Sequence, residues 1–155
     1  MTRANRPRFY ELTPGEALAL LERQHIGRLA FTFHDRVDIE PISYVFADGW
    51  VWGRTSAGNK LTTVLHHPWV AFEVDDIKSR FDWQSVVVHG TAYFLDPDRG
   101  EKEREAYSAG VRHLRELDTA VLTPDDPTPS RTTLFRIFAD NITTRAATTA
   151  PSPKT

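Results

Sequence analysis

The segment WVWGRTSAGNKL, residues 50–61, carries two cationic side chains at a corner that passes from a strand to a helix. A phosphate group needs several N–H donors and one or two cations, and a helix start offers free amides at the positive end of its dipole. Arg54 can contact phosphate through two nitrogens, and Lys60 adds a point charge. Thr55 and Ser56 can donate through their hydroxyls. The segment predicts an anion site; spacing alone also allows a solvated loop in which Ser56 caps a helix.

A second segment, WQSVVVHGTA at residues 83–92, has the composition of a central strand. Alternation along a strand places Trp83, Ser85 and Val87 on one face and their neighbours, Val86 among them, on the other. A glycine inside such a run indicates a bulge or the close approach of a ligand or another backbone. The alternative reading is an ordinary core strand.

Composition limits the classes of function. The 155 residues fit one domain, with a predicted boundary at residue 145 and a disordered tail over 146–155, which is rich in Ala, Thr, Pro and Ser. A formal charge of -2 gives no case for binding nucleic acid or an anionic membrane. The absence of cysteine excludes disulfides and thiolate metal sites, and no metal site is predicted. Without an apolar leader or membrane span, a cytoplasmic protein is expected.

The helices expected from the sequence are three. Thr13, Pro14 and Glu16 form the pattern of a capping box with proline at the first helical position, and this helix should stop near Gly27. A short helix should follow Lys60 and end before the pair His66-His67, which precedes a proline. A charged segment over 97–117 has apolar residues at helical spacing.

The strands expected from the sequence are about six, over 28–33, 37–46, 50–53, 69–74, 83–95 and 133–138. His34 to Arg36 and Asp48-Gly49 are the predicted turns of two hairpins. Pro41 favours an edge or an irregularity in its strand. Hairpin connections predict a mainly β (α+β) fold, a six-stranded antiparallel split β-barrel with flanking helices. The familiar glycine-rich nucleotide loops, GxGxxG and GxxxxGK[ST], are absent.

Five blocks in this order carry a family resemblance: IGRLAF, PISY, WVWGRTSAGNKL, VAFEVD and WQSVVVHGTA. Together they resemble the pyridoxamine 5'-phosphate oxidase-like proteins, the flavin-binding split β-barrel family, in its small actinobacterial branch that includes nitroimidazole-resistance-type reductases. The resemblance covers roughly residues 12–145. It implies a homodimer in which residues of both chains meet each FMN.

The resemblance also implies which residues bind the cofactor. The family binds the FMN phosphate and ribityl chain at positions that correspond here to the corner residues Arg54, Thr55, Ser56 and Lys60. The remaining implied contacts lie on two strands: Pro41, Ile42, Ser43 and Tyr44 beside the isoalloxazine ring, and Trp83, Ser85, Val86 and Val87 on the later strand.

Departures from the family pattern bear on the activity. The arginine-rich run of the true pyridoxamine phosphate oxidases is replaced by Glu-Pro-Ile-Ser-Tyr, residues 40–44, which argues against that oxidation. Gly53 or Arg54 stands where several relatives carry a histidine for haem binding or nitroimidazole reduction.

The function expected from the resemblance is that of an FMN-dependent oxidoreductase acting on a small molecule, with NAD(P)H as a candidate electron donor and the cofactor performing the chemistry. Two alternatives stay open: a deazaflavin-dependent reductase of the same fold, and a non-catalytic module that binds flavin or haem.

Overall fold

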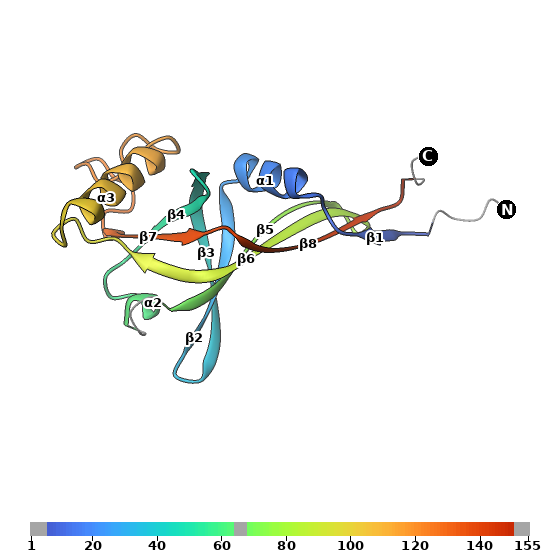
Figure 1. Cartoon of the computed structure of the whole chain (residues 1–155), viewed down its shortest axis with the longest axis horizontal. Coiled ribbons are helices and arrows are strands. Elements are labelled where there is room, and N and C mark those ends of the chain that lie inside the picture. Colours follow the sequence, from blue (N-terminus) through green and yellow to red (C-terminus); the bar gives the residue numbers. More distant parts are fainter. Residues whose placement is uncertain (1–5, 64–67, 151–155) are drawn as a thin grey trace.

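Six antiparallel strands close into a barrel in this computed structural model, which describes residues 6–63 and 68–150 (Figure 1). Going around the barrel, β2 is followed by β3, β4, β7, β6 and β5, which pairs again with β2. The barrel strands are β2 (Ile26–Phe33), β3 (Arg36–Ala47), β4 (Trp50–Thr55), β5 (Trp69–Ser79), β6 (Asp82–Phe94) and β7 (Thr133–Phe138). The predicted six-stranded antiparallel split barrel with flanking helices is confirmed.

Two further strands, which the sequence did not predict, extend the sheet beyond the barrel. β8 (Asn141–Thr148) pairs with β6, and β1 (Arg8–Tyr10) pairs with β8. Ala146 and Ala147, placed by the sequence in a disordered tail, are buried in β8. The tail prediction for residues 151–155 lies outside the described residues.

Both predicted hairpin turns are present. His34 and Asp35 have φ of 49° and 60°, and Asp48 and Gly49 have φ of 56° and 81°. Positive φ at both central residues is the signature of the turn type that matches strand twist. A third hairpin, between β5 and β6, begins later than expected, because β5 continues to Ser79 and not to residue 74.

Two long strands change partners along their length, and this closes the barrel. β3 pairs with β2 as far as Ser43 and with β4 from Tyr44 onward. β6 pairs with β8 as far as His89 and with β7 from Ala92. Pro41 therefore has a paired strand on one side only, which agrees with the edge position that its missing N–H predicts.

The helices lie as the sequence suggested, with shorter bounds. Helix α1 (Pro14–Arg23) begins with the predicted capping box of Thr13 and Glu16. Helix α2 (Lys60–Thr63) is a single turn, and its predicted end, with His66-His67, lies outside the described residues. Helix α3 (Glu101–Leu114) packs against β3, β4 and β7. No helix in the described ranges is long and apolar enough to cross a membrane.

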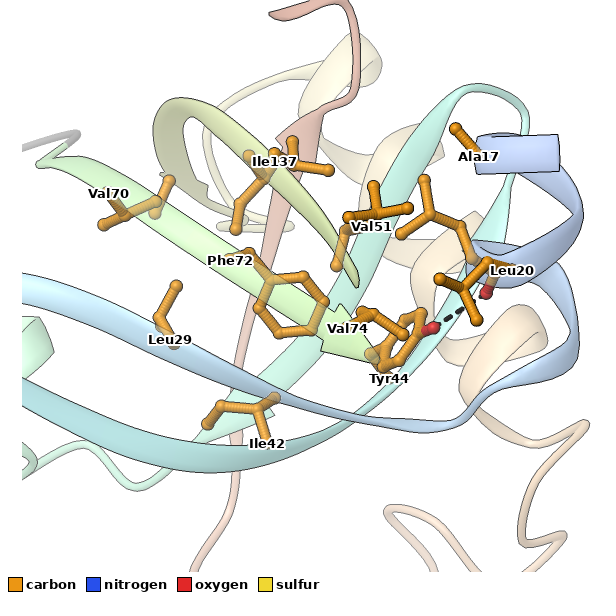
Figure 2. Close-up of a cluster of buried hydrophobic side chains, with 14 of the residues drawn as sticks. Ala17, Leu20, Leu29, Ile42, Tyr44, Val51, Val70, Phe72, Val74 and Ile137 are labelled. Atoms are coloured by element: carbon orange, nitrogen blue, oxygen red, sulfur yellow. Dashed lines mark hydrogen bonds between the residues drawn. The ribbon is translucent and has the colours of Figure 1, made fainter. Parts of the chain in front are cut away.

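The main core fills the barrel interior beneath α1. Figure 2 shows Ala17 and Leu20 of α1 reaching side chains of the barrel strands, with Phe72 at the centre. Phe72, Leu29 and Tyr44 have no exposed surface. A smaller cluster around Trp52 and Leu114 lies under α3. Among the described residues, α1 packs against β3, β5 and β6 on the core side, and α2 contacts β2.

Gly27 gives a test of this core. A Cβ at Gly27 would lie 2.3 Å from Cζ of the buried Phe72. Overpacking of a core costs about 1–3 kcal/mol, so we expect Gly27→Ala to lower the melting temperature by about 5 °C in differential scanning calorimetry. Gly15→Ala is the matched control, because its Cβ would meet no atom within 4 Å. Equal melting temperatures of the two variants would contradict the close packing of Gly27 against Phe72.

Candidate functional site

Arg54, at the end of β4, fastens the loop that follows α3 to the barrel. Its Nη1 and Nη2 donate to the two carboxylate oxygens of Asp126 at 2.6 and 3.0 Å. Nη1 also donates to the carbonyl oxygen of Arg131, and Nη2 to Oγ1 of Thr128, each at 3.0 Å. The side chains of Arg54 and Asp126 are 11% and 2% exposed. Both terminal nitrogens of the predicted phosphate ligand are thus occupied within the chain.

The Asp126 carboxylate is held ionised by this arrangement. The hydrogen bond from Arg54 lowers the pKa of Asp126 well below its ordinary range, against the opposing effect of burial. The backbone amides of Leu122 and Thr128 also donate to the carboxylate and lower its pKa further. Asp126 is therefore the anchor of the loop.

Lys60 lies in a hollow that Arg54 does not line. This hollow, of about 500 Å³, is formed by α2 and the β2–β3 hairpin, and Arg36 and His34 line it with Lys60. Lys60 Nζ contacts Asp38 at 3.0 Å, with 57% of the Lys60 side chain exposed. Three basic groups facing one acid give a donor set that suits a phosphate.

The remaining corner residues differ in accessibility. Thr55 is buried, whereas Ser56 is half-buried and its hydroxyl is 3.5 Å from that of Ser130. The Asn59 side-chain amide donates to both oxygens of Glu40, which ties the corner to β3. A Cβ at Gly58 would meet no atom within 4 Å, so the corner is open to a ligand. Ser56 and Lys60 can reach such a ligand, and Thr55 cannot do so without rearrangement.

The four predicted residues of β3 divide between the two faces of the strand. Pro41 and Ser43 are exposed on the side of the strand that points away from the core. Ile42 and Tyr44 point into the core, as Figure 2 shows, and the Tyr44 hydroxyl donates to the carbonyl oxygen of Leu21 at 2.8 Å. Burial raises the pKa of Tyr44. The side chains of Ile42 and Tyr44 therefore serve the fold and not the surface of the site.

The four predicted residues of β6 divide in the same way. Ser85 and Val87 are half-buried on the side of the strand that points away from the core, and Val86 is completely buried in the core. Trp83 lies near the hairpin end of β6, where its Nε1 donates to the carbonyl oxygen of Arg80 at 3.1 Å and its ring lies 6.4 Å from that of Phe9.

Cross-strand register unites the outward-facing residues of β3 and β6. Pro41 pairs with Arg28, Arg28 with Glu73, and Glu73 with Val87, so that one row crosses four strands. We call the outward-facing surface of β2, β3, β5 and β6 the outer face. It contains Pro41, Ser43, Ser85 and Val87 but neither Arg54 nor Thr55.

A charged cluster at the centre of the outer face was not predicted as part of the site. Arg28 Nη1 lies 3.5 Å from Glu73 and 3.1 Å from Asp75, and the Ser85 hydroxyl donates to Glu73 at 2.8 Å. Burial raises the pKa of Glu73, and the neighbouring Asp75 adds to the rise, while the Ser85 hydrogen bond and Arg28 oppose it. The predicted shared face of Ser85 and Val87 was a sequence signal for this face, but it did not identify Arg28, Glu73 or Asp75.

Large apolar side chains surround the charged cluster. Val37 and Ile39 on β3 are 81% and 62% exposed, Ile26 is 60% exposed and Trp69 is 65% exposed. Between Ile39 and β6 lie the small residues Ala30 and Ala71, which leave this part of the sheet flat. Large exposed apolar side chains on one face of a sheet indicate a site of contact with another molecule.

The fold is a small β-barrel with a basic hollow at Lys60 that lies beside the outer face. The family model described as pyridoxamine 5'-phosphate oxidase matches residues 13–146. The chain belongs to this family, which confirms the resemblance seen in the five sequence blocks.

Individual proteins are similar to this chain over most of its length. An uncharacterised protein of Mycobacterium tuberculosis, Rv0080, is 32% identical over 141 residues, which is 86% of this chain and 88% of that protein. The crystal structure of a protein from Corynebacterium glutamicum, described as a putative pyridoxamine 5'-phosphate oxidase, has a TM-score of 0.65 and 31% identity, covering 92% of this chain and all of the other. An FAD-binding protein of Mycobacterium smegmatis has a TM-score of 0.61 and 27% identity, covering 88% and 99%.

Proposed function

We propose that the protein binds FMN between two copies of the chain and acts as a flavin-dependent oxidoreductase on a small organic molecule. The observation that carries this proposal is the continuity of the basic hollow at Lys60 with the outer face. Val37 belongs to both, since it lines the hollow and stands exposed on β3. The family membership and the FAD-binding relative support a flavin as the ligand.

The chain's own residues would bind the cofactor at its two ends. The phosphate would lie in the hollow against Lys60 and Arg36, with Ser56 and the backbone of the open corner near it. The ring would lie along the outer face toward Pro41 and Ser43. Six residues of strand separate Val37 from Ser43, or about 20 Å, a span of the order of an extended flavin mononucleotide.

A bound flavin would supply two-electron transfer between a donor such as NAD(P)H and the substrate. The protein would contribute orientation and exclusion of water. The exposed Val37 and Ile39 support closure of the site by a second copy, because a homodimer would cover this apolar surface and shield the ring.

Purification in the dark and an absorbance scan test the identity of the cofactor. We expect bands near about 370 and 450 nm, the known bands of a flavin. Mass spectrometry of the cofactor released by heat separates FMN from FAD. A single band near about 420 nm would replace the proposal with deazaflavin or haem, which fluorescence distinguishes.

Lys60→Ala tests the phosphate position. A charge-assisted contact is worth about 1.5–3 kcal/mol, so the variant should bind FMN at least about tenfold more weakly in a fluorescence titration. Riboflavin has no phosphate, and its affinity should not change. Lys102→Ala, which removes an exposed lysine from α3, is the matched control. If Lys60→Ala weakened riboflavin and FMN equally, the phosphate would have to lie elsewhere.

A further inference from the structure

A second pocket, separate from the hollow at Lys60, lies between the barrel and the loop after α3. It has a volume of about 410 Å³. Ile26, Leu117 and Val121 give it an apolar wall, while His25, Arg54 and Arg131 line its polar side. Small-molecule sites are typically apolar cavities of roughly 300–1,000 Å³ with a few placed polar groups. The pocket has both properties, and the loop that forms it is held by the Arg54–Asp126 pair.

Arg131 has a fixed backbone and an available charge. Its carbonyl oxygen accepts from Arg54 at 3.0 Å, and its N–H donates to the carbonyl oxygen of Thr128 at 3.1 Å. Its side chain is exposed, and within residues 6–63 and 68–150 the guanidinium has no hydrogen bond or ion pair. The strand and the loop thus present a free guanidinium at the edge of an apolar pocket.

Two other charged groups, Arg54 and Asp118, line the pocket. Asp126 neutralises Arg54. Asp118, the acid that lines the pocket, accepts a hydrogen bond from the backbone amide of Ala120 at 2.9 Å. Asp118 keeps its negative charge, and the positive charge that remains for a ligand is that of Arg131, with His25 also in the lining. A carboxylate is the group that the planar fork of an arginine binds best.

We propose that this pocket binds a small organic acid, with its carboxylate on Arg131 and its apolar body against Ile26, Leu117 and Val121. Ser43 lines the pocket and also faces outward on β3, so the acid would lie beside the proposed flavin ring. The assignment of this acid as the substrate rests on the proposed function, whereas its binding does not. The substrate class of the proposed oxidoreductase would then be an apolar carboxylic acid.

The test uses 2-naphthoate, a two-ring carboxylate, and its neutral counterpart 2-naphthamide, both titrated calorimetrically into the 155-residue chain as purified. We expect the carboxylate to bind at least about tenfold more tightly than the amide, because it alone forms a charge-assisted pair. Arg131→Gln should remove about tenfold of the naphthoate affinity and leave that of naphthamide unchanged. The matched control is Arg104→Gln, an exposed arginine of α3 that does not line the pocket.

Three results would overturn the proposal: equal affinity for the two compounds, absence of binding by both, or an equal loss in the two arginine variants. Competition between naphthoate and added FMN would also overturn it, because the pocket would then belong to the cofactor site. The flavin proposal is judged separately, by absorbance of the purified protein. A protein that binds naphthoate at Arg131 but never contains flavin would keep this pocket and lose the proposed oxidoreductase.

Discussion

Asp126→Ala should lower the melting temperature by about 10 °C, because removal of one partner leaves the guanidinium of Arg54 buried without its counter-charge. The substitution removes both of the short contacts to Arg54 and the acceptor of two backbone amides. The loop after α3 would lose the contacts that fasten it to β4. Differential scanning calorimetry at neutral pH gives the measurement.

Asp125→Ala is the control for this prediction. Asp125 is the neighbouring acid in the same loop, and it is exposed. Its removal makes the same change in net charge without touching Arg54, so its melting temperature should stay within about 2 °C of the parent. Equal effects at positions 125 and 126 would mean that the Arg54 contact has no special weight in the fold.

The pH dependence of the Asp126 effect follows from the direction of its pKa shift. The folded protein holds the pKa of Asp126 below its unfolded value. The stabilisation is therefore complete above the unfolded pKa of about 3.9, and it declines as the pH falls toward the lower folded pKa. The difference between Asp126→Ala and the parent should be constant from pH 8 to 5 and shrink below pH 4.

The parts of the fold that sequence could predict are those that local chemistry determines. Two turns follow from residues that accept positive φ, Asp35 and Asp48 among them, and α1 follows from its capping box. β8 could not be predicted in this way. Its sequence, NITTRAAT, has no strong periodicity, and it becomes a strand because it pairs with β6 over residues 83–89.

In the candidate site, too, some residues follow from a local pattern and others are brought together only by the fold. Spacing on one strand predicted that Ser85 and Val87 share a face, and the register brings that face together with Pro41 and Ser43. The partner of Arg54 lies 72 positions further along the chain, and the separation of Arg28 from Glu73 is 45. No local pattern encodes such pairs. The sequence therefore suggested that Arg54 was available to a phosphate, although in the fold its guanidinium is bound to Asp126.

Ile39→Asp should convert the proposed dimer into a monomer. Ile39 is 62% exposed at the apolar part of the outer face, beside the small residues Ala30 and Ala71. A two-fold interface contains each residue twice, so one substitution introduces two carboxylates into the surface that must be desolvated. We expect the dimer dissociation constant to rise at least about 100-fold. Sedimentation equilibrium measures this change.

Leu18→Asp controls for the general effect of an added charge. Leu18 lies on α1, outside the outer face, and it is 40% exposed. This variant should keep the oligomeric state of the parent. A parent protein that is monomeric and fully loaded with FMN would contradict the two-copy site directly, whatever the variants do.

Cofactor content links the outer face to the proposed activity. If two copies enclose each flavin ring, Ile39→Asp must lose FMN along with the dimer, although it leaves Lys60 itself in place. Lys60→Ala should do the reverse and lose affinity for FMN while it stays dimeric. A monomeric Ile39→Asp that retained the parent's FMN affinity would place the whole cofactor site within one chain.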